Sequence, residues 1–181
     1  ADGLKGSYSG QLVSIASKSE DRRKNFGDKY DIHPDFRFDS YEDIINSEHI
    51  DAIYISTPHT LHAQWTIKAA GKGKHILCEK PGAINFNEGK KIIDAVREAG
   101  VFYMEGFMYR CHPQIPKLVE IIKNKIIGDV ISVETSFGFD MGKTIPDHRL
   151  FNKNLAGGGI LDVGLYPISF SRLIAGVATG D

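Results

Sequence analysis

The sequence predicts an α/β fold that contains half of a doubly wound parallel sheet. Short apolar runs alternate with helical patterns of about ten residues, and glycine, proline or small polar residues separate the two. Parallel strands need a crossover connection, which a helix supplies, so this alternation favours a parallel sheet. The alternation holds to about residue 107 and then changes.

Four runs are predicted as strands because each is short, apolar and bounded by turn-forming residues. They cover residues 11–17, 52–56, 75–78 and 101–104. A run that stays apolar on both faces is typical of a strand that helices cover on both sides. Pro58 is expected to end the second strand, because proline lacks the N–H that a sheet ladder needs.

The helices between these strands are predicted from their capping residues. A serine, threonine or asparagine side chain accepts a hydrogen bond from an unpaired N–H in the first turn, and glycine often follows the last turn. The predicted caps are Ser19, Ser40, Thr60 and Asn85, and the predicted ends lie near Gly27, Ile45, Gly71 and Gly100.

The pattern after Met108 differs from the first part of the chain. We expect a helix over residues 113–127, a longer alternating strand over 130–139, a polar loop, and an apolar helix over 160–174. This change predicts a domain boundary, with one domain over residues 1–107 and the beginning of a second over residues 108–181.

The bulk composition restricts the class of protein. The 181 residues include 22 basic and 23 acidic side chains, so the net charge of -1 offers no field that attracts nucleic acid or an anionic membrane. The two cysteines lack C-x-x-C spacing, and no unbroken run approaches the roughly 20 apolar residues of a membrane span. These features predict a cytoplasmic protein without nucleic-acid or membrane partners.

Ligands of open parallel sheets bind beyond the carboxyl ends of the strands, so the residues there are the first candidates for a site. Three such segments are residues 17–19, 57–59 and 79–81. Pro81 disfavours a helical conformation at Lys80, which would project the lysine from the strand end. The alternative is that Lys80 is a solvated surface lysine.

Asp162 and Tyr166 form a second candidate, because residues four apart lie on the same face of a helix. Alternatively, Tyr166 is a core aromatic and Asp162 interacts with the helix dipole. His59 and His62 are three apart, but no third ligand is spaced sensibly nearby, so no metal site is predicted.

Four segments together resemble one protein family. The segments are residues 73–81, 157–166, 57–62 and 105–113, and they resemble the GFO/IDH/MocA family of glucose-fructose oxidoreductases, inositol dehydrogenases and dimeric dihydrodiol dehydrogenases. The resemblance implies an NAD(P)-binding Rossmann domain followed by an α/β substrate domain with an open sheet. It also implies a homo-oligomer that exchanges hydride with a hydroxyl-bearing carbon of a sugar, polyol or diol.

The resemblance implies a role for each candidate residue. Tyr166 would be the acid/base, Lys80 would stabilise its phenolate, and Asp162 would orient the substrate hydroxyl or Lys80. The implied substrate-binding residues are Lys80, Arg110, Asp162 and Tyr166. The implied cofactor-binding residues are Ser17, Lys18, Arg22, Ser56, Thr57, Pro58, His59, His62, Glu79, Lys80 and Pro81. Arg110 has the alternative of pairing with a carboxylate, and the histidines that of helix-end polar groups.

The cofactor is expected to be NADP rather than NAD. NAD sites place an acid at the end of the second strand, whereas Ser17, Lys18 and Arg22 occupy that neighbourhood here and suit a 2′-phosphate. Alternatively, the two cations only face solvent. The family opens with a strand and a glycine-rich turn that this sequence lacks, so we expect the chain to be incomplete at both ends.

Two other functions remain open on the sequence. Some relatives are non-catalytic regulators that sense nucleotides or sugars on the same fold, and a regulator need not keep an acid/base pair. A second alternative keeps the enzyme but changes the reaction, to reduction of biliverdin or of an imine.

Overall fold

The computed structural model describes residues 1–143 and 145–180. The chain forms two compact units that interleave along the sequence, and each is described here by itself. The first unit comprises residues 1–55, 64–77 and 90–104, and the second comprises residues 56–63, 78–89 and the chain from residue 105 onward. The predicted domain division after residue 107 stays a prediction.

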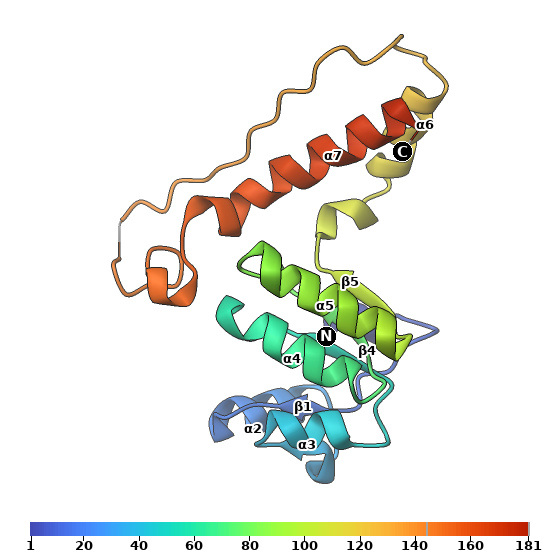
Figure 1. Ribbon diagram of the computed structural model, residues 1–181. Coiled ribbons are helices and arrows are strands. Elements are labelled where there is room, and N and C mark those ends of the chain that lie inside the picture. The colour runs from blue at the N-terminus through green and yellow to red at the C-terminus, as the bar shows by residue number, and fades with distance from the viewer. Residues whose placement is uncertain (144, 181) are drawn as a thin grey trace. The chain divides into compact units, whose positions relative to one another are not determined.

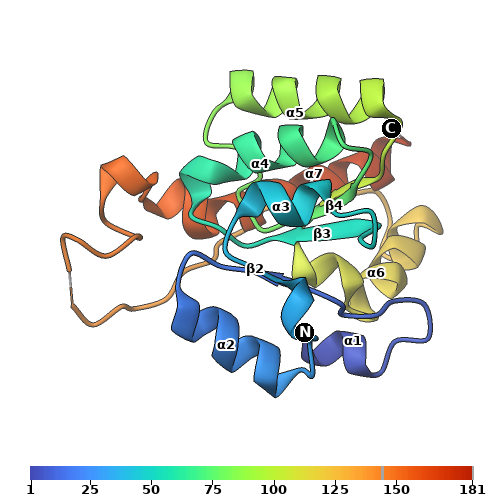
Figure 2. The same ribbon diagram turned by 90° about the horizontal axis from the view of Figure 1, so that it is seen from below.

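The strands form two small sheets, labelled in Figures 1 and 2. β1 (Ile15–Ala16) pairs in parallel with β2 (Arg37–Phe38), and β3 (Ala52–Ile55), β4 (His75–Cys78) and β5 (Tyr103–Glu105) form a second sheet in that order. The predicted α/β class is therefore confirmed. The first strand is much shorter than the predicted run over residues 11–17, since only two of its residues pair with a neighbour.

Helices connect these strands as the alternation predicted. They are α2 (Glu20–Lys29), α3 (Tyr41–Asn46), α4 (His62–Ala70) and α5 (Phe86–Ala99), with short 3-10 helices at Pro34–Phe36 and His59–Leu61. α1 (Asp2–Lys5) precedes the first strand. Their buried apolar side chains form the core with those of the strands. On α5, Ile92 and Val96 are buried and lie four apart on one face.

Three of the four predicted caps are confirmed. The side chains of Ser19, Ser40 and Asn85 accept hydrogen bonds from backbone N–H groups three residues later, at 3.3, 3.4 and 3.0 Å. The prediction for Thr60 is wrong, because this residue lies inside the 3-10 helix His59–Leu61 that leads into α4. Pro58 precedes that helix and supplies no side-chain cap.

Gly27 lies two residues before the end of α2 at Lys29, so the predicted helix end near this glycine is confirmed. The residue is buried, and a Cβ at this position would lie 2.3 Å from Nε of Arg37. Arg37 is held in that place by hydrogen bonds to the carbonyl of Ile32 (2.7 Å) and to Oδ1 of Asp28 (2.6 Å). Gly27 is therefore a packing residue that leaves room for the arginine.

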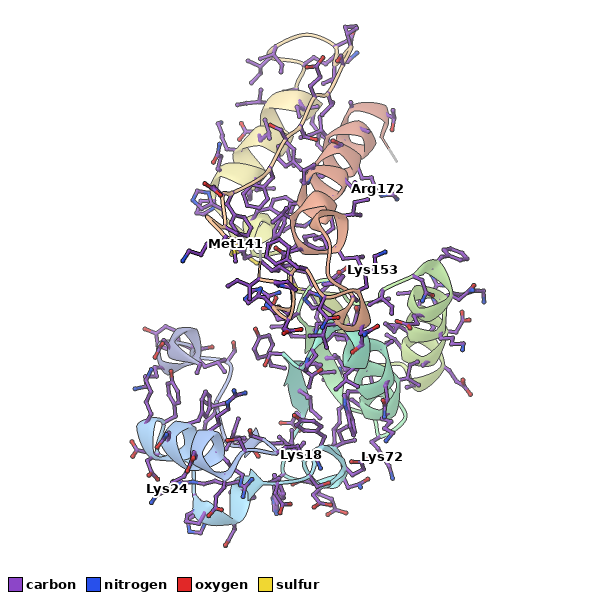
Figure 3. All side chains as sticks on the ribbon, turned by 90° about the vertical axis from the view of Figure 1, so that its left-hand side faces the viewer. Lys18, Lys24, Lys72, Met141, Lys153 and Arg172 are labelled. Carbon is purple, nitrogen blue, oxygen red and sulfur yellow. The ribbon has the colours of Figure 1, made fainter. Side chains whose placement is uncertain are left out.

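The second unit is mainly helical among its described residues. Its main elements are α6 (Gln114–Lys123), a π-helix (Ile160–Gly164) and α7 (Leu165–Thr179), with 3-10 helices at Met108–Cys111 and Lys153–Leu155. α6 packs against α7, as Figure 1 shows, and the labelled side chain of Arg172 on α7 points away from α6 in Figure 3.

The predicted strand over residues 130–139 is wrong. The segment is extended but irregular, and Figure 1 draws it as a long trace. A strand needs a neighbour to pair with, and neither sheet of the described chain includes this segment. Its side chains meet α7 instead, where Oγ1 of Thr135 lies 3.0 Å from Oγ of Ser171.

One helical stretch, Lys153–Thr179, is long and apolar enough to cross a membrane by length and composition alone, with a mean hydropathy of 1.4 in its most apolar window. The stretch is apolar on average although Asp162 and Arg172 interrupt it, so no unbroken apolar run marks it in the sequence. A core helix has the same composition, and Asp162 in this stretch forms ion pairs.

Candidate active site

Lys80 and Asp162 form a buried ion pair in the second unit. Lys80 lies two residues after the end of β4, and its side-chain Nζ donates to the backbone carbonyl of Asp162 at 2.5 Å and to its Oδ1 at 3.2 Å. The two side chains are only 16% and 10% exposed. Lys80 and Asp162 are 82 positions apart in the sequence but are in contact in the structure. A candidate site that contains both residues requires this contact.

Tyr166 adjoins this pair. Nζ of Lys80 lies 5.3 Å from the centroid of the Tyr166 ring, so the ammonium lies over the face of the ring. The rings of Phe107 and Phe137 form T-shaped pairs with the same ring, with centroid distances of 5.6 and 5.3 Å. Tyr109 packs beside them and hydrogen bonds through its hydroxyl to Ser169 at 2.8 Å. These aromatic contacts thus fix the orientation of the Tyr166 ring.

The phenol of Tyr166 is harder to ionise than a free tyrosine. Burial, and then the negative charges of Glu79 and Asp162, raise its pKa above the ordinary value. This direction is opposite to the expectation that Lys80 lowers it. The main physical reason is burial, which disfavours the charged phenolate, and the two carboxylates act in the same direction.

Arg149 is a third charge at the site that sequence reasoning missed. Its Nη1 lies 3.6 Å from Oδ1 of Asp162, the oxygen that also meets Lys80, and its side chain is 56% exposed. No local signal marks this arginine, because it lies in an irregular segment and its partner is 13 residues further along the chain. Phe107 and Tyr109 lie within a family-like segment, so their aromatic character was a signal that could have been used.

His62 ties together two loops of the same unit. It is 1% exposed, and its Nδ1 and Nε2 lie 2.7 Å from the carbonyl oxygens of Pro81 and Thr57 respectively. Because Pro81 follows Lys80 directly, this histidine supports the turn that carries the lysine. The pKa of the neighbouring His59 is lowered, first by burial and then by the charges of His62 and Arg149.

Two polar atoms at the end of β3 have no hydrogen-bond partner among the described residues. They are Oγ1 of Thr57 and Nδ1 of His59, and both are buried. A buried polar group normally has a partner, so these atoms are suited to contact a ligand. Glu79 lies at the end of β4, where its Oε2 accepts from the backbone N–H of Lys80 at 3.3 Å.

Ser17, Lys18 and Arg22 belong to the first unit, and Arg110 belongs to the second. Lys18 and Arg22 are exposed in the first unit, and Nζ of Lys18 lies 5.7 Å from the centroid of the Tyr41 ring. Ser17 accepts a hydrogen bond from Arg23 through its carbonyl at 2.6 Å. Arg110 is exposed, and its guanidinium lies 5.8 Å from the centroid of the Tyr109 ring.

Comparison with protein families gives two matches that together span most of the chain. Residues 2–107 match the model of an oxidoreductase family with an NAD-binding Rossmann fold, and residues 115–179 match the GFO/IDH/MocA C-terminal domain. Among curated proteins, the chain is 37% identical over 166 residues to D-xylose 1-dehydrogenase (NADP(+)) 2 of Haloferax volcanii. It is 34% identical over 166 residues to trans-1,2-dihydrobenzene-1,2-diol dehydrogenase of Mus musculus.

Solved structures give the same result. The aldose-aldose oxidoreductase of Caulobacter crescentus superimposes with a TM-score of 0.84 at 30% identity, covering 92% of this chain and 50% of that one. The 3-ketoreductase KijD10 of Actinomadura kijaniata, bound to NADP and TDP-benzene, gives a TM-score of 0.77 at 27% identity, covering 96% and 52%. The two curated relatives match over 92% of this chain, and the chain spans about half of their length.

Proposed function

Because the chain belongs to the GFO/IDH/MocA oxidoreductase family, with its NAD-binding Rossmann fold, we propose that the full protein exchanges hydride between NADP and a carbon that bears a hydroxyl group. The substrate is a sugar, polyol or diol, as the names of the xylose and dihydrodiol dehydrogenases suggest. The observation that carries this proposal is the buried Lys80–Asp162 pair beside the phenol of Tyr166.

Tyr166 is the proton donor and acceptor in this proposal. Its raised pKa keeps the phenol protonated at neutral pH, which suits donation of a proton to the carbonyl oxygen of a substrate that is being reduced. In the reverse direction the same oxygen accepts the hydroxyl proton. Lys80 and Asp162 orient the substrate oxygen and the tyrosine ring, and Arg110 contributes to substrate binding. The bound nicotinamide supplies or accepts the hydride.

The residues present fit a dinucleotide. The unpartnered Oγ1 of Thr57 and Nδ1 of His59 would hydrogen bond to it, in the loop that also contains Ser56, Pro58 and His62. Glu79, Lys80 and Pro81 would border the reacting ring. In the first unit, the exposed cations Lys18 and Arg22 near Ser17 would favour the 2′-phosphate of NADP. The relatives bound to or named for NADP support that choice.

An absorbance assay of nicotinamide reduction tests the proposal in the full protein that carries this sequence. Lys80→Met and Tyr166→Phe are each expected to lower turnover by roughly 100-fold or more, the usual contribution of a positioned acid or base. Lys72→Met and Tyr8→Phe are matched controls, because both of these side chains are exposed. The proposal fails if a panel of sugars, polyols and diols gives no turnover, or if both site variants retain near-normal rates.

A further inference from the structure

Arg149 brings unused hydrogen-bond donors to the candidate site. Its Nη1 lies 3.6 Å from Oδ1 of Asp162, which is close enough for an ion pair but too long for a hydrogen bond. A guanidinium has five N–H groups, and within the described part of the chain none of those of Arg149 donates a hydrogen bond to a protein acceptor. The side chain is also 56% exposed, so its donors are free to meet a ligand.

The loop that carries Arg149 is held by its own backbone. The N–H of Gly157 donates to the carbonyl of Asn152 at 3.0 Å. The N–H of Gly158 donates to the carbonyl of Leu150, the residue after Arg149, at 2.9 Å. A Cβ at position 157 would lie 2.8 Å from the carbonyl oxygen of Arg149, so only glycine fits there without a shift of the loop. The backbone of Arg149 is therefore fixed, although its side chain is exposed.

The charge of Arg149 reaches two parts of the proposed site. One is Asp162, which is proposed to orient the substrate. The other is His59, which is proposed to contact the cofactor. Burial is the main cause of the lowered pKa of His59, and the positive charges of Arg149 and Lys80 contribute to it. Arg149 is therefore within electrostatic range of both the substrate side and the cofactor side of the site.

The charges around Arg149 favour a neutral ligand oxygen over an anion. Lys80 and Arg149 supply two positive charges. Glu79 and Asp162 supply two negative charges, both close enough to raise the pKa of Tyr166. With its cations compensated in this way, the site has no excess positive charge to attract a carboxylate or a phosphate. A hydroxyl group accepts hydrogen bonds without carrying a charge, so it suits the free donors of Arg149.

We propose that Arg149 is a specificity-determining residue, which binds the substrate hydroxyl group on the carbon next to the reacting carbon. The inference rests on the proposed function, in which Lys80, Asp162 and Tyr166 hold the reacting oxygen. Nζ of Lys80 and Nη1 of Arg149 lie 3.2 and 3.6 Å from the same atom, Oδ1 of Asp162, so the two donor groups are adjacent. Two oxygens on adjacent carbons match adjacent donors. The preferred substrates are therefore vicinal diols, including sugars with a hydroxyl group next to the reacting position.

A simpler explanation is that Arg149 only compensates the charge of Asp162. Lys80 already does so at a shorter distance, and it also donates to the carbonyl of Asp162. The ion pair of Arg149 is largely exposed, and exposed pairs contribute little. The two explanations differ for a substrate that lacks the second hydroxyl group. Charge compensation affects every substrate equally, whereas a hydrogen bond from Arg149 affects only the substrates that carry that hydroxyl group.

The test removes the arginine and the hydroxyl group separately. The full protein is assayed with NADP and two pairs of compounds, D-xylose with 2-deoxy-D-xylose, and trans-cyclohexane-1,2-diol with cyclohexanol. We expect Arg149→Met to lower kcat/KM about 30-fold for the compound with the second hydroxyl group and less than about 3-fold for its deoxy partner, since one charge-assisted hydrogen bond is lost. Arg172→Met, at an exposed arginine on α7, is the matched control and should change neither value. Equal losses for both members of a pair, or no loss, overturn the proposal.

Binding is measured separately, so that the outcome does not depend on turnover. The 15N nuclear magnetic resonance signal of the Arg149 side chain, assigned by its loss in Arg149→Met, is recorded in the full protein with NADP. We expect D-xylose or trans-cyclohexane-1,2-diol to shift this signal, whereas the deoxy partner should not, and the Arg172 signal should stay in place. A protein without turnover on any compound removes the proposed function alone, since the signal still decides on Arg149. A signal that neither compound shifts, or that the deoxy partner shifts equally, overturns the inference.

Discussion

The structure predicts the coupling free energy between the side chains of Lys80 and Asp162. A double-mutant cycle with Lys80→Met, Asp162→Asn and the combined variant isolates the part that belongs to the carboxylate, because the Asp162 carbonyl remains in every variant. At 3.2 Å, a Coulomb interaction in an effective dielectric of about 20 reaches about 5 kcal/mol, and desolvation offsets much of it. We therefore expect a coupling of about 2 kcal/mol, as for other charge-assisted hydrogen bonds.

A second cycle on the same carboxylate is the control. Arg149 lies 3.6 Å from the same oxygen but is 56% exposed, so the coupling of Arg149→Met with Asp162→Asn should stay below about 1 kcal/mol. Both couplings follow from urea unfolding of the single and double variants, read as free energies of unfolding. A Lys80 coupling no larger than the Arg149 coupling would refute the reasoning that burial of the pair sets its strength.

Three further changes should be visible in the free energy of unfolding. Gly27→Ala should destabilise the protein by about 1–3 kcal/mol because the new methyl group overlaps Arg37. Gly89→Ala, inside α5, should stabilise it by about 0.5–1 kcal/mol, because the new methyl group would make only an ordinary contact with Cβ of Ala83, at 3.8 Å. His62→Leu should cost about 2–4 kcal/mol, since it removes the buried ring nitrogens that meet the carbonyl oxygens of Pro81 and Thr57. Because the pKa of Tyr166 is raised in the folded protein, the protonated phenol adds to the free energy of unfolding. This added stability is complete below about pH 10, the ordinary pKa of tyrosine, and is lost as the pH rises through the folded-state pKa. The free energy of unfolding of Tyr166→Phe should therefore depend less on pH at alkaline pH.

Urea unfolding measures all three, with a different control for each. Equal effects of alanine at positions 27 and 89 would contradict the packing role of Gly27. The exposed His112 is the control for His62, because His112→Leu should have little effect, and similar losses from both would remove the claim that His62 joins two loops. If the free energy of unfolding has the same dependence on alkaline pH in Tyr166→Phe and in the wild type, ionisation of this phenol does not affect stability.

Local patterns predicted the regular elements well because they act over a few residues. Capping by Ser19, Ser40 and Asn85 depends on a side chain and an N–H three positions away, so the sequence alone is sufficient. The prediction of a strand over residues 130–139 was wrong because strand pairing depends on distant residues, and neither described sheet includes this alternating segment. The packing of Arg37 against Gly27 also depends on residues that are not neighbours in the sequence.

The candidate site divides in the same way. Lys80 was predicted from its place after a strand, and Asp162 and Tyr166 from their spacing on a helix. Resemblance to a family supported all three, and each of these signals is present in the sequence alone. The tertiary structure alone decided that Lys80 is bound by Asp162 across 82 positions, that Arg149 shares the carboxylate, and that the pKa of Tyr166 rises. Ion pairing and desolvation depend on which charges meet and how deeply they are buried, and long-range packing fixes both.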